Sequence, residues 1–205
     1  IDIHYQIDGD ISDKTIMFSN SLASTLIMWD LQIEHLLAQG FGIIRYDSRG
    51  HGQSEAPKGP YSIEMLADDA AALLDVLDIK SVHFCGLSKG GMVAQMMGVR
   101  HADKVKSLTI ADSAAFMPAK DTWEQRIQAV TNGGMEAVVD ATTERWITSE
   151  GRDRLPGQVE LIRQMILKTP VQGFVACSEA IKSMDMRTTN PKISAPTIVI
   201  CGEQD

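Results

Sequence analysis

The sequence predicts an α/β fold in which a mostly parallel sheet carries helices on both faces and a helical segment is inserted late in the chain. Two observations support this. Over residues 1–117, short apolar runs of strand length alternate with segments that have helical spacing, and parallel strands require such helical crossovers. Over 118–190 only helical segments are found, punctuated by Gly and Pro, and 191–205 returns to a strand. We therefore expect a core at 1–117, an insert at 118–190 and a return to the core sheet at 191–205.

The individual elements follow from periodicity and from start and stop signals. Strands are predicted at 1–7, 14–20, 41–46, 81–85, 105–111 and 197–201, the last of them buried, and helices at 29–39, 63–77 and 89–100. In the first of these helices, Trp29, Ile33 and Leu36 fall on one face. Ser62 is the expected N-cap of the second helix.

Composition excludes some classes of partner. The chain has 205 residues, 19 Lys and Arg against 27 Asp and Glu, and a net charge of −8, without a basic face for nucleic acid. No run approaches the roughly 20 apolar residues that a membrane span needs. Cys85, Cys177 and Cys201 lack metal-ligand spacing. We expect them to be buried reduced thiols, which favours a cytoplasmic location.

The strongest motif is the run Gly86-Leu87-Ser88-Lys89-Gly90, between a predicted strand and a predicted helix. This is the nucleophile-elbow pattern G-x-S-x-G in the context that it requires. The strand-to-helix turn is so sharp that a Cβ at either glycine would clash, and the strained serine exposes its hydroxyl. Ser88 also lies at a helix N-terminus, whose free N–H groups can stabilise an oxyanion. The motif therefore predicts Ser88 as a catalytic nucleophile.

A second motif, Arg45 to Ser54, lies in a loop rich in Gly that follows a strand. His51 within it could be a catalytic base. Loop packing is the commoner use of such a residue, because glycine-rich loops of this kind serve turn geometry. We therefore interpret His51 as a structural residue.

Taken together, these residues resemble the α/β-hydrolase superfamily and, within it, the 3-oxoadipate enol-lactonases of the β-ketoadipate pathway of aromatic catabolism. The resemblance covers almost the whole chain. It is carried by five segments, Asn20–Asp30, Arg45–Glu64, His83–Gln95, Glu144–Thr148 and Pro196–Asp205. The elbow alone identifies only the superfamily, whereas the other segments narrow the resemblance to this branch.

The resemblance implies further site residues. The backbone N–H groups of Leu22 and Lys89 would form the oxyanion hole, and the order of the triad is Ser, then acid, then His. Asp205, just after the last strand, is the expected triad acid, and Asp112, after the strand at 105–111, is its rival. The insert would form a cap over the pocket. Possible substrate contacts there are Trp123, Arg145, Trp146 and, less specifically, Arg163, although cap core or a solvated surface would also explain them.

Two features depart from the family pattern. Lys89 stands where the family usually has an apolar residue, and its side chain would either bind a substrate carboxylate or extend into solvent. All five histidines precede Asp205, so none occupies the triad position. We therefore expect that these 205 residues are a fragment without the catalytic His and that they are inactive on their own.

The function implied is hydrolysis of a small lactone or ester, most specifically the enol-lactone of 3-oxoadipate, through an acyl-enzyme on Ser88 and without metal or organic cofactor. Alternatives on the same fold are a carboxylesterase, a C–C bond hydrolase and a haloperoxidase-like relative. A non-catalytic ligand receptor or interaction module is the alternative from another class. The intact elbow argues against it.

Overall fold

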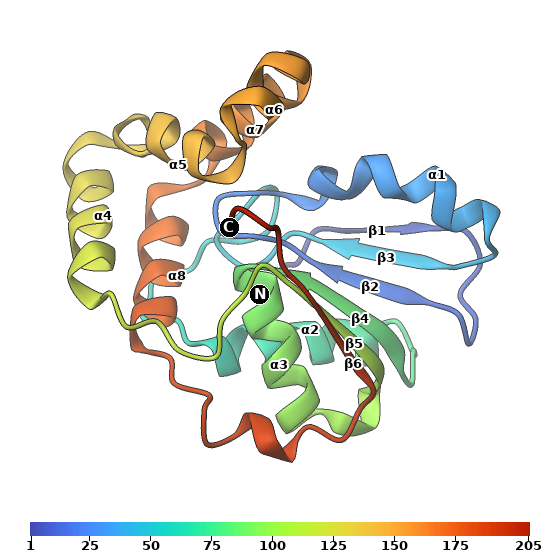
Figure 1. Cartoon of the computed structure of the whole chain (residues 1–205). Coiled ribbons are helices and arrows are strands. Elements are labelled where there is room, and N and C mark those ends of the chain that lie inside the picture. The colour runs from blue at the N-terminus through green and yellow to red at the C-terminus, as the bar shows by residue number, and fades with distance from the viewer.

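The computed structural model describes all of residues 1–205 and contains one six-stranded sheet, in the order β1-β3-β2-β4-β5-β6 (Figure 1). The strands are β1 (Tyr5–Asp8), β2 (Ile16–Ser19), β3 (Ile43–Tyr46), β4 (Val82–Leu87), β5 (Val105–Ala111) and β6 (Thr197–Ile200). Strands β2 to β6 are parallel, and only β1 runs antiparallel to its neighbour β3. The predicted mostly parallel sheet is confirmed.

Helices cover both faces of the sheet because its strands are apolar on both sides. The core helices are α1 (Asp30–Ala38), α2 (Ile63–Val76) and α3 (Lys89–Arg100). Along β2, Met17 packs into the large core with residues of α2 and α3, whereas Phe18 packs on the α1 side with Trp29 and Ile43. The predicted N-cap of α2 is confirmed: the Ser62 hydroxyl accepts the Met65 N–H at 3.2 Å.

The inserted segment is helical, as predicted. It contains α4 (Lys120–Gly133), α5 (Val139–Trp146), α6 (Ser149–Arg154), α7 (Pro156–Lys168) and α8 (Val171–Ser183), which Figure 1 shows grouped beyond the ends of the strands. We call these five helices the helical block. One hydrophobic core runs from the sheet into the block without a break and includes Phe84, Met97, Val130 and Phe174. None of the helices combines the length and the apolar character needed to cross a bilayer.

The block touches the backbone of the core at α8. A Cβ on Gly173 would lie 1.9 Å from the carbonyl oxygen of Gly50, so the two backbones touch at a point where neither residue can carry a side chain. Gly50 also has a φ of +77°, a conformation that favours glycine. Helix α8 therefore packs directly against the glycine-rich loop of the core.

One prediction about burial is wrong. The strand at 197–201 was expected to be buried, yet all four residues of β6 are exposed, including Ile198 at 63% and Val199 at 72%. Within residues 1–205, β6 lies at the edge of the sheet and pairs only with β5, which leaves its side chains uncovered. Cys201 is accordingly exposed, whereas Cys177 is buried and Cys85 is half-buried.

Candidate active site

The elbow has the geometry that its glycines predict. Ser88 has φ +53° and ψ −113°, a region that side-chain-bearing residues rarely adopt. A Cβ on Gly86 would meet the Gly90 carbonyl oxygen at 2.0 Å, and a Cβ on Gly90 would meet the Ser19 carbonyl oxygen at 2.0 Å. Only glycine therefore fits on either side of this turn, and the strained serine is held by its surroundings.

Hydrogen bonds hold the backbone of Ser88 and leave its hydroxyl free. The Ser88 N–H donates to the Ala111 carbonyl at 2.9 Å, and the Ser88 carbonyl accepts from the Ser113 hydroxyl at 2.8 Å. The Ser88 hydroxyl makes no hydrogen bond, and the residue is only half-buried, whereas the following residue, Lys89, is buried. An incoming carbonyl carbon can therefore reach this oxygen, although its role as nucleophile stays a prediction.

The two backbone N–H groups expected to form the oxyanion hole, those of Lys89 and Leu22, are free of hydrogen bonds within the protein. Lys89 is the first residue of α3. The N–H groups of the first helical turn have no acceptor within the helix, and they lie at the positive end of the helix dipole. Leu22 lies in a buried loop, and its N–H makes no hydrogen bond. The loop is held next to Leu22: the Ala23 N–H donates to His51 Nε2 at 3.0 Å, and the Leu26 N–H donates to Asp47 Oδ1 at 2.7 Å.

His51 is a structural residue, as interpreted from the sequence. Its Nε2 accepts the Ala23 N–H, and its Nδ1 lies 3.2 Å from the Arg49 carbonyl, which fits a neutral ring that donates from Nδ1. Burial, reinforced by the charge of Lys89, lowers the pKa of His51 to about 3. Both ring nitrogens are occupied, so His51 is not free to take a proton from Ser88.

Of the other four histidines, three are hydrogen-bonded to other side chains and the fourth is exposed. His4 lies beside Gln53, His83 beside the Ser107 hydroxyl and His101 beside Asp68, while His35 is exposed on α1. None of the five hydrogen-bonds to Ser88, which agrees with the expectation from their order in the chain.

The expectation for the Lys89 side chain is wrong in both of its forms. The side chain neither reaches into solvent nor is free to bind a substrate carboxylate, because Lys89 is 0% exposed and its Nζ donates to the Ser48 hydroxyl at 2.8 Å. Burial lowers the pKa of its ammonium group. Sequence reasoning could not find this contact, because Ser48 lies 41 residues earlier in the chain.

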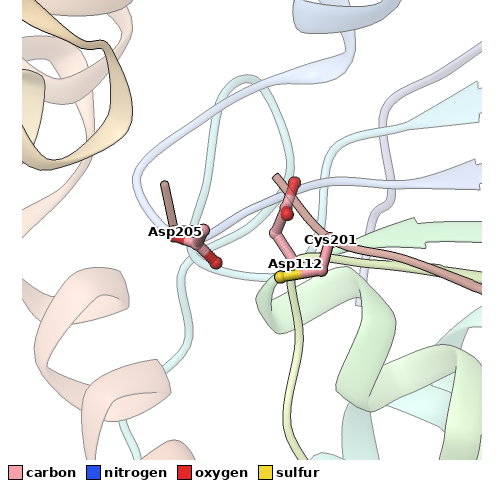
Figure 2. A group of neighbouring side chains, drawn as sticks. All are labelled: Asp112, Cys201 and Asp205. Carbon is pink, nitrogen blue, oxygen red and sulfur yellow. The ribbon is translucent and has the colours of Figure 1, made fainter. Parts of the chain in front are cut away.

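The two candidate acids lie together at the carboxyl ends of adjacent strands. Figure 2 shows Asp112, Cys201 and Asp205, whose side-chain ligand atoms all lie within 4.8 Å of one another. Asp112 Oδ1 accepts the Gly202 N–H at 2.8 Å, so this carboxylate holds the turn that leads to Asp205. Asp205 is exposed. This is the one cluster of possible metal ligands in the structure, and two of its three members are exposed.

The helical block contains one charge that sequence reasoning missed. Arg126 of α4 is half-buried, forms no ion pair and lies over the Trp123 ring at 4.6 Å and the Phe174 ring at 5.8 Å. Burial, with a smaller effect from the positive charge of Arg145, lowers the pKa of Arg126 to about 10, so it stays charged at neutral pH. The W-x-x-R spacing of Trp123 and Arg126, one helical turn, is the sequence signal that could have revealed it.

The predicted substrate contacts fall into two groups. Trp123 is 9% exposed and belongs to the continuous core, and Trp146 packs against the same core. Arg145 is exposed and has no ion-pair partner, whereas Arg163 is paired with Asp140 at 2.5 Å. Arg145 thus has no partner, and its charge contributes to the lowered pKa of Arg126, whereas Arg163 has a partner of its own.

Comparison with known proteins agrees with this geometry. Residues 14–205 match the family described as alpha/beta hydrolase fold. The chain is 34% identical to 3-oxoadipate enol-lactonase 2 of Acinetobacter baylyi over 99% of this chain and 76% of that protein, and 34% identical to 3-oxoadipate enol-lactonase 1 of the same organism over 98% and 74%.

A solved structure is also similar. The crystal structure of the enol-lactonase from Burkholderia xenovorans superimposes with a TM-score of 0.94 at 39% identity, over 98% of this chain and 78% of that one. The elbow, the mostly parallel sheet and these similarities lead to one conclusion: the chain belongs to the α/β-hydrolase fold family and is a lactone or ester hydrolase.

Proposed function

We propose that the protein hydrolyses the enol-lactone of 3-oxoadipate through an acyl-enzyme on Ser88. The observation that carries the serine mechanism is the strained, half-buried Ser88 at the elbow with a free hydroxyl. The similarity to two 3-oxoadipate enol-lactonases supports the choice of substrate. Unpaired cationic charge in the helical block supports it independently, because this lactone carries a carboxylate.

In the proposed reaction, Ser88 Oγ attacks the lactone carbonyl while a general base takes its proton. The N–H groups of Leu22 and Lys89 stabilise the tetrahedral oxyanion, each contributing about 3–4 kcal/mol. Cleavage of the ring C–O bond leaves an acyl group on Ser88, and the departing enol oxygen takes the proton from the base. Water, activated by the same base, then attacks the acyl carbon and releases the carboxylic acid and free Ser88.

The base is proposed to be a histidine other than the five at positions 4–101, because each of those is engaged elsewhere or exposed. Asp205 is proposed as the acid that orients it. The position of Asp205 beyond the end of β6, two strands from the elbow in the sheet order, supports this role. Carboxyl ends of parallel strands gather at one edge, where α/β proteins bind their ligands.

The substrate carboxylate is proposed to bind at Arg126 and Arg145. Burial and, to a smaller extent, the positive charge of Arg145 lower the pKa of Arg126, and neither guanidinium has a carboxylate partner, so a bound anion would stabilise the charge of this site. Arg126 is also fixed by the rings of Trp123 and Phe174, which reduces the entropy lost on binding. In this proposal residues 118–190 act as the cap that selects substrates, and 1–117 with 191–205 form the catalytic core.

Arg126→Met tests the carboxylate site in protein expressed from its whole gene. We expect KM for the carboxylate-bearing enol-lactone to rise about 10- to 100-fold, equivalent to the roughly 1.5–3 kcal/mol of a hydrogen bond to a charged group. KM for a neutral lactone of similar size should stay within about twofold. Arg163→Met is the matched control, because it removes a block arginine that already has a partner. An equal rise for both substrates would contradict the proposed site.

A further inference from the structure

The Lys89 side chain is a buried cation that the proposed mechanism does not use. The residue is 0% exposed, forms no ion pair, and its Nζ makes one hydrogen bond, to Ser48 Oγ at 2.8 Å. An unpaired buried ammonium or amine is costly, so the surroundings must hold this group in place. Burial disfavours its charged form, but the neutral amine and the ammonium can both donate to Ser48.

Ser48 belongs to the loop 47–54, which also supports the second half of the oxyanion hole. Asp47 in this loop accepts two backbone N–H groups, from Leu26 at 2.7 Å and from Gln53 at 3.0 Å. His51 accepts the Ala23 N–H at 3.0 Å. The loop 47–54 therefore accepts hydrogen bonds from the segment that follows Leu22 at two residues, Ala23 and Leu26.

These contacts form a continuous path between the two expected oxyanion donors. The path starts at the Lys89 backbone, follows its side chain to Ser48, passes along the loop through His51, and ends at Ala23 beside Leu22. The positive φ of Ala23, +58°, shows that this end of the path is also held in a strained conformation. Both donors are thus attached to the loop 47–54, one through its neighbour and the other through its own side chain.

We propose that the Lys89 side chain is a positioning residue for the oxyanion hole, which it serves by bonding the start of α3 to the loop 47–54 and so fixing the distance between the N–H groups of Lys89 and Leu22. This inference rests on the proposed role of Ser88. It differs from a role in binding, because the buried Nζ is held by Ser48 and leaves substrate affinity to other residues.

Three variants in protein expressed from its whole gene test this: Ser48→Ala, Lys89→Met and the double variant. The substrate is p-nitrophenyl acetate, which is small and uncharged, and the inhibitor is a trifluoromethyl ketone, which forms a tetrahedral adduct with its oxygen in the oxyanion hole. Ser48→Ala leaves Nζ buried without a partner, whereas Lys89→Met removes the polar group and fills the space with an apolar chain.

We expect Ser48→Ala to lower kcat about tenfold, less than the hundredfold or more that loss of a whole donor costs, with KM within about twofold. Inhibitor binding should weaken by the same factor as kcat. Lys89→Met should lower kcat by about threefold without lowering the melting temperature, and the double variant should equal Lys89→Met and so be more active than Ser48→Ala. Ser178→Ala, which removes a buried hydroxyl that has no partner, is the matched control and should retain the wild-type kcat.

The inference is overturned if Lys89→Met keeps the wild-type kcat and inhibitor affinity. It is equally overturned if the double variant is as impaired as the product of the two single losses. Lys89→Met decides the question alone if Ser48→Ala does not fold. Failure here is distinct from failure of the proposed function, because Ser88→Ala would still abolish turnover in the first case and would leave it intact in the second.

Discussion

The elbow and the helical block differ in how their polar groups are satisfied. Around the elbow, buried polar side chains such as Asn20, Asp47 and His51 each bond to a backbone group nearby. In the block, Arg126 and Arg145 have no ion-pair partner. The comparison teaches that the polar groups around the elbow are satisfied within the protein, whereas the two arginines of the block remain available to an anion. This difference is the basis for our proposal that the elbow sets the reaction type and the block sets the choice of substrate.

The largest effect that would test this comparison is expected at the elbow. Ser88→Ala removes the proposed nucleophile but keeps the turn, so kcat should fall by about a millionfold, while the melting temperature should change little. Steady-state hydrolysis of a lactone and a thermal melt measure the two quantities. Substantial turnover by this variant would show that the elbow is not the reactive centre.

The two acids at the sheet edge sharpen the comparison next. Asp205→Asn should lower kcat by roughly ten-thousandfold, because the acid orients the base and stabilises its charged form. Asp112→Asn should cost much less, since an amide oxygen can still accept the Gly202 N–H. The kcat values of both variants, measured in parallel, check this ranking, and the reverse order would move the triad acid to β5.

The contact between α8 of the helical block and the glycine-rich loop of the core is expected to depend on glycine. Gly173→Ala places a methyl group 1.9 Å from the Gly50 carbonyl oxygen, so backbone must move. We expect a loss of about 1–3 kcal/mol in the free energy of unfolding, typical of overpacking. Urea denaturation measures it, with Gly157→Ala as the matched control because a Cβ there meets nothing within 4 Å. An unchanged stability would mean that α8 can withdraw from the core loop.

The effect expected from acid is the smallest when it is expressed per pH unit. His51 has a folded pKa of about 3 against about 6.5 in the unfolded chain. Between these values the unfolded state binds more protons, so stability should fall as the pH drops from about 6.5 towards 3, with a slope of at most about 1.4 kcal/mol per pH unit from this group. Urea midpoints at several pH values measure the slope, and His51→Gln should reduce it. An identical slope in that variant would argue against a buried neutral His51.

Much of the fold could be predicted because its signals are local. The strand at 105–111, the helix at 89–100 and the Ser62 N-cap were placed correctly, since alternating burial and capping depend on residues within one or two turns. The apolar run of β6 predicts a buried strand, whereas within residues 1–205 β6 is the edge strand and is exposed.

The sequence by itself determined the position of the elbow, because two glycines and a serine at fixed spacing between a strand and a helix fit a sharp turn in which a Cβ at residue 86 would meet the Gly90 carbonyl oxygen. Only the tertiary structure decided the surroundings of Lys89, the role of Asp112 as an acceptor for Gly202, and the unpaired state of Arg126. The physical reason is range. The backbone clash at Gly86 involves a residue four positions away, whereas the carbonyl that faces Gly90 belongs to Ser19 of β2. The hydrogen-bond partners lie 41 positions away for Lys89 and 90 for Asp112, and only folding brings them together.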